Sequence, residues 1–403
     1  MGTSYTVKLV TDSHSIDNAE IREEIRKTLD EINARMSTYD PDSELSRWND
    51  AETTDWFPVS EETAAVTAEA IRIGRVTEGA FDVTLDPLVR LWQFGPRDSN
   101  LATEKDTDRI PNNEEIKDTL QLVGFSQIES RTNPPAVRKR KARIRVDLSG
   151  IAKGYGVDRM AELLKHRGFE NYMVEIGGEI RASGHNLAGR PWRIGIESPK
   201  SGTREIDSIV DLGTRAMATS GDYRNYFEKD GVRYSHLLDP RNGRPISHRL
   251  ASVTVLAETC AEADALATGL MVLGPDTGFD LARSPDFESR GIAAAFIVRN
   301  DDGFVQKKTA NWPLADIAEK TEPASTGASM ITAFLAALIV LAAAMLALSI
   351  GPIIRKRKMQ CSCKTARQIM KATDPRHKKP HSSNPKTSPL LPILPNDSDD
   401  LNE

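Results

Sequence analysis

Apolar side chains near the start of the chain are spaced three or four residues apart, which places them on one face of an amphipathic helix over 16–36. They are Ile21, Ile25, Leu29, Ile32 and Met36. Short apolar runs bounded by turn residues predict strands, and two of these runs lead directly into further helical patterns. The predicted strands are Tyr5–Val10, Val146–Ser149, Tyr172–Ile176 and Ala251–Ala257, and the later helices cover 152–166 and 260–273. The mixture predicts an α+β body.

The longest apolar pattern lies near the C-terminus. Residues 330–354 contain no charged side chain, and about 20 such residues match the thickness of a bilayer as one helix. A buried core helix is the alternative, but it needs apolar partners on all sides and rarely runs this long. The next four residues are Arg or Lys. The positive-inside rule therefore predicts a single-pass protein of the inner membrane, with a periplasmic body and a cytoplasmic tail over 355–403. Beyond Lys364 the tail is rich in Pro, Ser, Lys and Asp, a composition typical of disorder.

That topology requires an export signal, and the first five residues offer no apolar stretch. The start also fits the short N-myristoylation pattern, which would anchor the opposite end of the protein. We therefore expect a signal upstream of Met1, either removed or outside this sequence.

Composition narrows the class of protein. With 403 residues, 39% hydrophobic, 28% charged and 6% aromatic, the chain is neither collagen-like, nor wholly disordered, nor a polytopic membrane protein. The net charge of -5 conceals two parts, because residues 355–403 contain 11 Lys or Arg and only 5 Asp or Glu. The remaining body is acidic, which argues against nucleic acid as its partner. Three cysteines are too few to hold so long a chain together. A basic run at 138–141 that follows two prolines is interpreted as a solvated turn.

Residues 147–155, DLSGIAKGY, read as a strand end, a glycine-containing turn and a helix start. Such a junction directs backbone amides at an anion, and Gly150 and Gly154 allow close approach to the backbone. Lys153 adds a positive charge suited to phosphate. A plain turn capped by Asp147 explains the pattern equally well.

Asp264 and Thr268 lie four residues apart, on one face of a predicted helix. A carboxylate and a hydroxyl suit Mg²⁺, which prefers oxygen ligands, better than zinc. Taken alone, the pair is better explained as an ordinary helix start and a hydroxyl bonded to a backbone carbonyl.

His236 lies in a strand that ends in a Pro/Asn/Gly turn, and it is a candidate general base. A single histidine is more often structural. Thr219–Tyr223 supplies small polar groups, and Glu175–Glu179 ends a strand in two glycines flanked by carboxylates. No nucleophile elbow, Walker loop, GxGxxG or HExxH pattern is present.

Together these segments resemble the ApbE family of FAD:protein FMN transferases, in order, over residues 1–318. The matching motifs are MGT, MSTYDPDSELSRWN, TEGAFDVTLDPLVRLWQFGP, VDLSGIAKGYGVD, YMVEIGGEIRASG, ATSGDYRNYF, SHLLDPRNGRPISH and EADALATGLMVLG. The resemblance implies a T-fold-like α+β body that binds FAD and Mg²⁺. It also implies transfer of FMN from FAD to a Thr or Ser hydroxyl of a respiratory flavoprotein, with release of AMP.

The resemblance further implies roles for individual residues. His236 would be the catalytic base, and a main-chain oxygen of Gly150 would hold Mg²⁺ together with Asp264 and Thr268. The residues implied to bind FAD are Met1, Tyr39, Ala80, Phe81, Asp82, Asp147, Lys153 and Leu238. Leu238 and Asn242 replace the isoleucine and threonine that are usual in the family.

The predicted organisation is an ApbE-like domain at 1–320, a linker at 321–329, the membrane helix at 330–354 and the tail. The apolar helix followed by Cys361 and Cys363 resembles NqrM, an assembly factor of the Na⁺-translocating NADH:quinone reductase, over about 330–365. A simple anchor with incidental cysteines is the alternative. Two other activities stay open: Mg²⁺-dependent FAD pyrophosphatase and assembly factor. The acceptor would be a flavoprotein subunit, such as one from that reductase, and Ser329 in the linker is a candidate for self-flavinylation.

Overall fold

A computed structural model describes residues 2–11, 18–95, 109–199, 205–223, 226–313 and 370–372. In these residues the helices are α1 (Asn18–Met36), α2 (Glu44–Asp50), α3 (Glu61–Val76), α4 (Asp86–Leu91), α5 (Asn113–Leu120), the 3-10 helix η1 (Phe125–Gln127), α6 (Ser149–His166), α7 (Cys260–Leu273), α8 (Thr277–Ala282) and α9 (Pro285–Ser289). The strands are β1 (Tyr5–Val10), β2 (Phe57–Pro58), β3 (Ile128–Thr132), β4 (Pro135–Lys139), β5 (Asn171–Ile176), β6 (Glu179–Ser183), β7 (Arg193–Glu197), β8 (Ile206–Asp211), β9 (Ala216–Gly221), β10 (Tyr226–Lys229), β11 (Val232–Ser235), β12 (Leu238–Asp239), β13 (Arg244–Pro245), β14 (Leu250–Ala257), β15 (Ala293–Asn300), β16 (Gly303–Lys308) and β17 (Met370–Ala372). The α+β class predicted from the sequence is confirmed.

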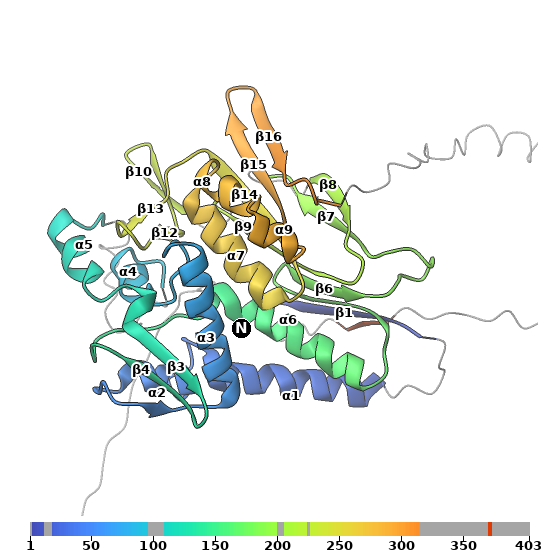
Figure 1. Ribbon diagram of the computed structural model, residues 1–403, viewed down its shortest axis with the longest axis horizontal. Helices are drawn as coiled ribbons and strands as arrows, with labels where there is room; N and C mark the ends of the chain where they lie inside the picture. Colours follow the sequence, from blue (N-terminus) through green and yellow to red (C-terminus); the bar gives the residue numbers. More distant parts are fainter. Residues whose placement is uncertain are drawn as a thin grey trace, which may run out of the picture.

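The centre of the fold is an antiparallel sheet with the strand order β16-β15-β14-β9-β6-β5-β1-β17 (Figure 1). Strands far apart in sequence lie side by side in it. Thr6 of β1, for example, pairs with Glu175 of β5. Smaller sheets, β2-β4-β3, β7-β8, β10-β11 and β12-β13, lie outside it.

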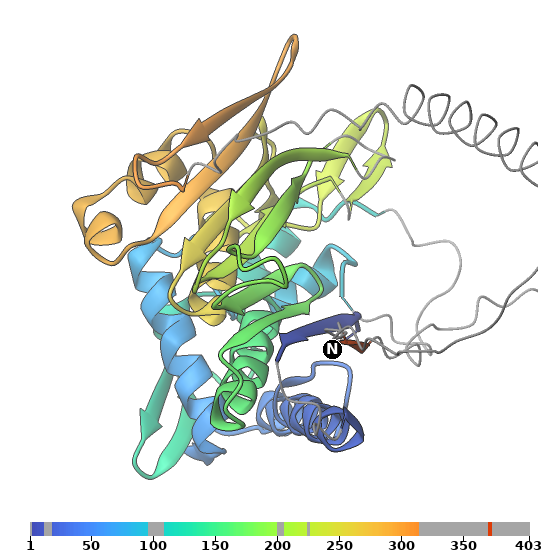
Figure 2. The ribbon, with the colours of Figure 1, turned by 90° about the vertical axis from the view of Figure 1, so that its right-hand side faces the viewer.

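The two faces of this sheet are covered differently. The long helices α6 and α7 pack on one face (Figure 1), with Val157 and Leu266 among their fully buried residues. The other face is covered by the β7–β8 hairpin, whose Ile194 and Ile196 pack in one cluster with Met217 of the sheet. Helix α1 lies below β1, against α6 (Figure 2).

Helices α6 and α7 cross at a glycine. A Cβ atom added to Gly154 would lie 2.2 Å from the carbonyl oxygen of Cys260, so only glycine lets the two backbones approach this closely. Asp158, one turn further along α6, accepts hydrogen bonds from the N–H groups of Cys260 and Ala261, each at 2.9 Å. Thr259 caps the same end of α7 by accepting from the Glu262 N–H. The start of α7 is thus fixed against the middle of α6.

Most of the predicted elements are confirmed. Helices α1, α6 and α7 and strands β1, β5 and β14 appear within a few residues of their predicted bounds.

Two predictions are wrong, and Asn49 contributes to both. Val146–Ser149 is not a strand, because the side chain of Asn49 bonds both the N–H and the carbonyl of Val146, at 2.7 and 2.8 Å, and Ser149 already begins α6. The basic run at 138–141 is not a solvated turn. Its Lys139 ends strand β4, is 1% exposed, and donates to the Asn49 carbonyl at 3.0 Å. Burial lowers the pKa of Lys139 to about 8.

In the part of the chain that the structure describes, no helix has the length and apolar character needed to cross a bilayer. The predicted span at 330–354, the linker at 321–329 with Ser329, and the Cys361 and Cys363 pair lie outside the described residues. They stay predictions.

Candidate active site

A cavity of about 590 Å³ opens where two strands of the central sheet separate. Strand β9 pairs with β14 along the whole length of β9, whereas it pairs with β6 only at Ala216 and Met217. Beyond this short pairing, Thr219, Ser220 and Gly221 of β9 line the cavity. We call it the lysine cavity. It is lined by Ser149, Gly150, Lys153, Glu175, Gly177, Gly178, Glu179, Ile180, Gly195, Ile196, Glu197, Met217, Thr219, Ser220, Gly221, Tyr223, His236, Leu237, Asp264 and Thr268.

Lys153 joins the two helices at the floor of this cavity. Its Nζ lies 3.2 Å from both carboxylate oxygens of Asp264 on α7 and 3.7 Å from Glu179 Oε1 on β6. It also donates to the Ser149 carbonyl at 3.1 Å. Asp264 Oδ2 accepts a further bond from the Gly154 N–H at 3.1 Å. The glycine that allows the helix crossing therefore also brings these charges together.

Burial and neighbouring charges change the ionisation of the groups at this point. Burial, followed by the proximity of Asp264, raises the pKa of Glu179 well above its usual range, and burial raises the pKa of Asp264. Burial lowers the pKa of Lys153, but Asp264 and Glu179 raise it by more, so this lysine is charged. Glu179 Oε2 is buried and has no hydrogen-bond partner among the described residues. One cation thus faces two buried carboxyl groups.

The three residues implied to hold Mg²⁺ meet at this cavity. Thr268 Oγ1 lies 3.0 Å from Ser220 Oγ, and a Cβ atom on Gly150 would lie 3.8 Å from the same Thr268 oxygen. The Gly154 N–H, one turn after Gly150 in α6, donates to Asp264 Oδ2. The candidate ligands are all oxygens, the type that Mg²⁺ prefers. Within the described ranges no three His, Cys, Asp or Glu residues cluster as a metal site.

His236 also lines this cavity. It lies in the short connection between β11 and β12, is half-buried, and has the ring of Phe94 edge-on at 6.5 Å. The structure therefore brings together Gly150, Lys153, Asp264, Thr268 and His236, which are distant in sequence.

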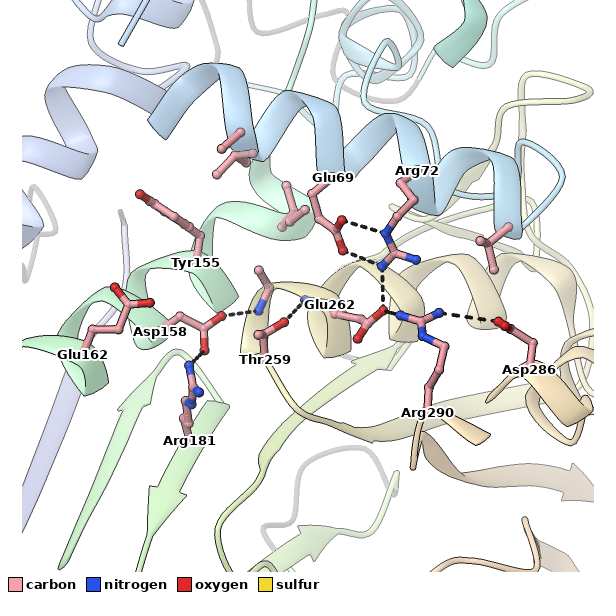
Figure 3. A pocket seen from close by; sticks show the side chains of 15 residues that line it. Glu69, Arg72, Tyr155, Asp158, Glu162, Arg181, Thr259, Glu262, Asp286 and Arg290 are labelled. Atoms are coloured by element: carbon pink, nitrogen blue, oxygen red, sulfur yellow. Dashed lines mark hydrogen bonds and ion pairs between the residues drawn. The ribbon is translucent and has the colours of Figure 1, made fainter. Parts of the chain in front are cut away.

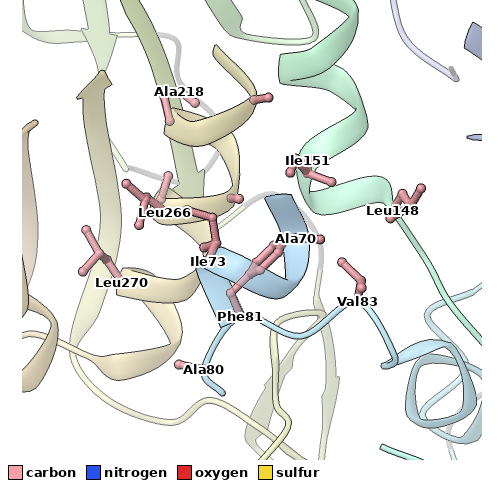
Figure 4. Close-up of a cluster of buried hydrophobic side chains, with 14 of the residues drawn as sticks. Ala70, Ile73, Ala80, Phe81, Val83, Leu148, Ile151, Ala218, Leu266 and Leu270 are labelled. Carbon is pink, nitrogen blue, oxygen red and sulfur yellow. The ribbon is translucent and has the colours of Figure 1, made fainter. Parts of the chain in front are cut away.

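The other residues predicted to bind FAD do not line this cavity. Ala80 and Phe81 are buried in the core cluster shown in Figure 4. A Cβ atom on Gly150 would lie 3.1 Å from the Phe81 ring. Asp82 is also buried, and its carboxylate accepts from the Thr84 N–H, the Thr84 hydroxyl and the Phe125 N–H. Burial raises its pKa.

Three more predicted residues, Asp147, Leu238 and Tyr39, also do not line the lysine cavity. Asp147 bonds the N–H and hydroxyl of Ser149, the first residue of α6. Leu238 is 2% exposed and packs in a cluster with Leu88 and Trp92, while the side chain of Tyr39 is 71% exposed. Met1 lies outside the described residues.

Several residues that line the cavity are not predicted by any sequence pattern. Glu179 and Ser220 fall in segments noted for their polar groups, but no local pattern marks Glu179 as buried beside Lys153. No sequence pattern predicts that strand β7, which contains Gly195, lines the cavity, because the position of β7 depends on how the β7–β8 hairpin folds over the sheet.

A second, larger cavity of about 800 Å³ lies on the other side of the α6–α7 pair (Figure 3). We call it the arginine cavity. Its three arginines, Arg72, Arg181 and Arg290, all form ion pairs with carboxylates. None of the predicted site residues lines it.

Comparison with known proteins identifies close relatives. The sequence model of the ApbE family matches residues 1–296. The FAD:protein FMN transferase of Vibrio cholerae is 46% identical over 312 residues, which cover 77% of this chain and 89% of that protein. The protein of the same name from Haemophilus influenzae is 46% identical over 315 residues, covering 77% and 88%.

Solved structures of flavin transferases are also similar to this chain. The flavin transferase ApbE from Vibrio cholerae superposes with a TM-score of 0.69 at 45% identity, over 77% of this chain and 95% of that one. The apo form of the Pseudomonas stutzeri flavinyl transferase ApbE has a TM-score of 0.68 at 38% identity, over 77% and 92%.

Proposed function

The chain belongs to the ApbE family and is a flavin transferase, and we propose that it moves FMN from FAD to a Thr or Ser hydroxyl of a partner respiratory flavoprotein, with release of AMP. The observation that carries the proposal is the meeting of Lys153, Asp264, Thr268 and His236 at one cavity. A phosphate-binding cation, hard oxygen ligands and a base are the groups that this reaction needs.

At the phosphorus atom, the reaction forms one P–O bond and breaks another. The acceptor oxygen attacks the FMN phosphorus of FAD, the bond from that phosphorus to the bridging oxygen breaks, and AMP leaves with the electron pair. A ring nitrogen of His236 takes the proton of the hydroxyl as the new bond forms.

The remaining residues bind and orient the diphosphate. Lys153 Nζ places positive charge beside it, and Ser149 and Gly150 at the start of α6 line the same cavity. Asp264, Thr268 and the Gly150 carbonyl would hold Mg²⁺, which when bound neutralises charge developing on the phosphate oxygens.

The experiment combines the protein with FAD, Mg²⁺ and a recombinant flavoprotein subunit that carries FMN on Thr or Ser. Transfer gives a fluorescent acceptor band on a denaturing gel together with one AMP per label. Free FMN and AMP without a labelled band would instead identify a FAD pyrophosphatase.

The role of His236 has its own test. We expect His236→Gln to lower the transfer rate by about 10²–10⁴-fold, because the acceptor alcohol loses its base, while FAD still binds. An unchanged rate would exclude His236 as the base.

We propose the membrane topology from the sequence pattern alone, with 330–354 as the span and the body outside the cytoplasm. In the structure, however, Met370–Ala372 pair with β1, and this contact cannot form within one molecule whose tail lies across the membrane. Protease treatment of intact spheroplasts decides between the two arrangements. Digestion of the body with protection of an epitope after residue 372 supports the span, and loss of both contradicts it.

A further inference from the structure

The edge of strand β7 forms one wall of the lysine cavity. Three consecutive residues, Gly195, Ile196 and Glu197, line the cavity. Side chains of consecutive strand residues point to opposite faces, so one face of a strand cannot present three in a row. The cavity therefore meets the edge of β7, where backbone groups point.

The hydrogen-bond pattern shows which backbone groups these are. The Leu212 N–H donates to the Trp192 carbonyl at 2.8 Å, and the register continues with Ile194 opposite Val210 and Ile196 opposite Ser208. In an antiparallel pair, alternate residues bond the partner strand and those between them point away. The N–H and carbonyl groups of Arg193 and Gly195 therefore face away from β8, and Gly195 lines the cavity.

This edge of β7 is exposed at Gly195, and the residues on either side of Gly195 anchor the strand in the core. In the described part of the chain, β7 belongs to a sheet of only two strands, so no strand pairs with its second edge. Gly195 is exposed, whereas its neighbours Ile194 and Ile196 are 8% and 5% exposed and anchored in the core. A Cβ atom at position 195 would point toward the side chain of Ile206, away from this edge.

We propose that the acceptor protein binds as an extended segment that adds a strand to the open edge of β7. The inference rests on the proposed function, which requires a protein hydroxyl to enter this cavity. Main-chain hydrogen bonds to Gly195 and Arg193 would hold the segment, as in other cases of strand addition. The backbone of the acceptor then runs along the cavity wall that β7 forms.

The geometry favours a peptide as the occupant. Donor and acceptor groups along the β7 edge repeat every two residues, about 6.6–6.8 Å apart, and another extended backbone presents the complementary repeat. An isoalloxazine or adenine ring has no such series of amides. The segment must be extended and must lack proline at the positions that bond β7.

Proline substitution tests the edge directly. Gly195→Pro removes the one N–H that this residue offers to the cavity and leaves the bonds of β7 to β8 in place. We expect the KM for the acceptor subunit to rise about tenfold or more, as for loss of a backbone hydrogen bond, while the Kd for FAD, measured by fluorescence quenching, stays within twofold. Ile209→Pro is the matched control, because Ile209 faces Gly195 in the pair and its N–H points to the outer edge of β8.

The outcomes separate the two proposals. Equal acceptor KM values for Gly195→Pro and the wild type, or a parallel loss of FAD binding, would overturn strand addition. Equal losses in Gly195→Pro and Gly195→Ala would overturn it too, because alanine keeps the N–H. Failure of the wild type to label any acceptor would count against the proposed function instead.

A second measurement does not depend on turnover. Synthetic acceptor peptides that carry one N-methylated amide each are tested for binding by competition with the labelled subunit. Strand addition predicts a loss of binding at every second position, with the positions between tolerating methylation. Loss at neither set, or at both sets equally, excludes the paired strand.

Discussion

The two cavities lie on opposite sides of the same helix pair, yet their charges are arranged differently. On α6, Ser149, Gly150 and Lys153 face the lysine cavity, and Ile151, Tyr155 and Asp158 face the arginine cavity. The arginine cavity is the larger, but its arginines are all matched by carboxylates. The smaller one has a single cation, Lys153, among its described lining residues.

This difference shows that volume does not identify the reactive site. Every carboxylate that lines the arginine cavity belongs to an ion pair with an arginine. In the lysine cavity, a buried carboxyl group with an unpartnered oxygen lies beside a second carboxyl group and one lysine, and these groups offer oxygen ligands to a divalent cation. The unpartnered oxygen of Glu179 therefore supports the proposal that Mg²⁺ and the diphosphate of FAD bind at the lysine cavity.

The largest effect is expected from Asp264→Asn. The change keeps the shape of the side chain but removes the charge that positions Lys153 and would hold Mg²⁺. Flavin transfer should fall on the order of 10²–10³-fold, measured by the rate of acceptor labelling. Normal transfer in this variant would remove the basis for treating the lysine cavity as the active site.

Gly154→Ala tests the crossing that separates the two cavities. Because the new Cβ would meet the Cys260 carbonyl at 2.2 Å, we expect a loss of about 2–3 kcal/mol in the free energy of unfolding. Urea denaturation measures it. Gly95→Ala is the control, since its Cβ meets nothing closer than 3.4 Å and should leave stability nearly unchanged.

The raised pKa of Glu179 also predicts that the stability of the protein depends on pH. The folded protein raises the pKa of Glu179 above its ordinary value of 4.5, so the native state holds this proton more tightly than the unfolded chain. Stability should therefore fall as pH rises above 4.5 toward the raised pKa. In EDTA and without FAD, Glu179→Gln should be about 4 kcal/mol more stable than the wild type at pH 8 and equal to it near pH 4. Parallel Tm profiles for the two proteins would show that Glu179 is not protonated in the fold.

The smallest effect is expected in the arginine cavity. Glu262, two residues before Asp264 on α7, accepts from both Arg72 and Arg290. Because the arginines are partly exposed, Glu262→Gln should cost about 1 kcal/mol of stability and leave transfer within twofold of the wild type. If transfer falls as far as in Asp264→Asn, the functional contrast between the cavities is wrong.

The sequence predicted the long elements well because their patterns are local. Helix α7 and strand β14 are each marked by apolar residues and a cap or turn, and both appear at nearly their predicted bounds. Val146–Ser149 failed because Asn49, almost 100 residues earlier, satisfies its backbone. Residue identity alone could not show this.

The site was predictable only in part, for the same reason. Lys153, Asp264, Thr268 and His236 carry chemistry in their side chains, and motifs point to them. The wall formed by Gly195 consists of backbone groups, which any residue except proline provides in full. Such a wall depends on which strands remain unpaired, a property of the tertiary fold.

The order of the central sheet has a consequence for biosynthesis. Strand β1 is made first, but its neighbour β5 follows more than 160 residues later, and β14 to β16 complete the sheet later still. At typical rates of about 5–20 residues per second, β1 leaves the ribosome on the order of 10 s before it can pair. During that interval the nascent chain exposes an apolar strand, so chaperone binding to the first 100 residues should govern the yield of folded enzyme.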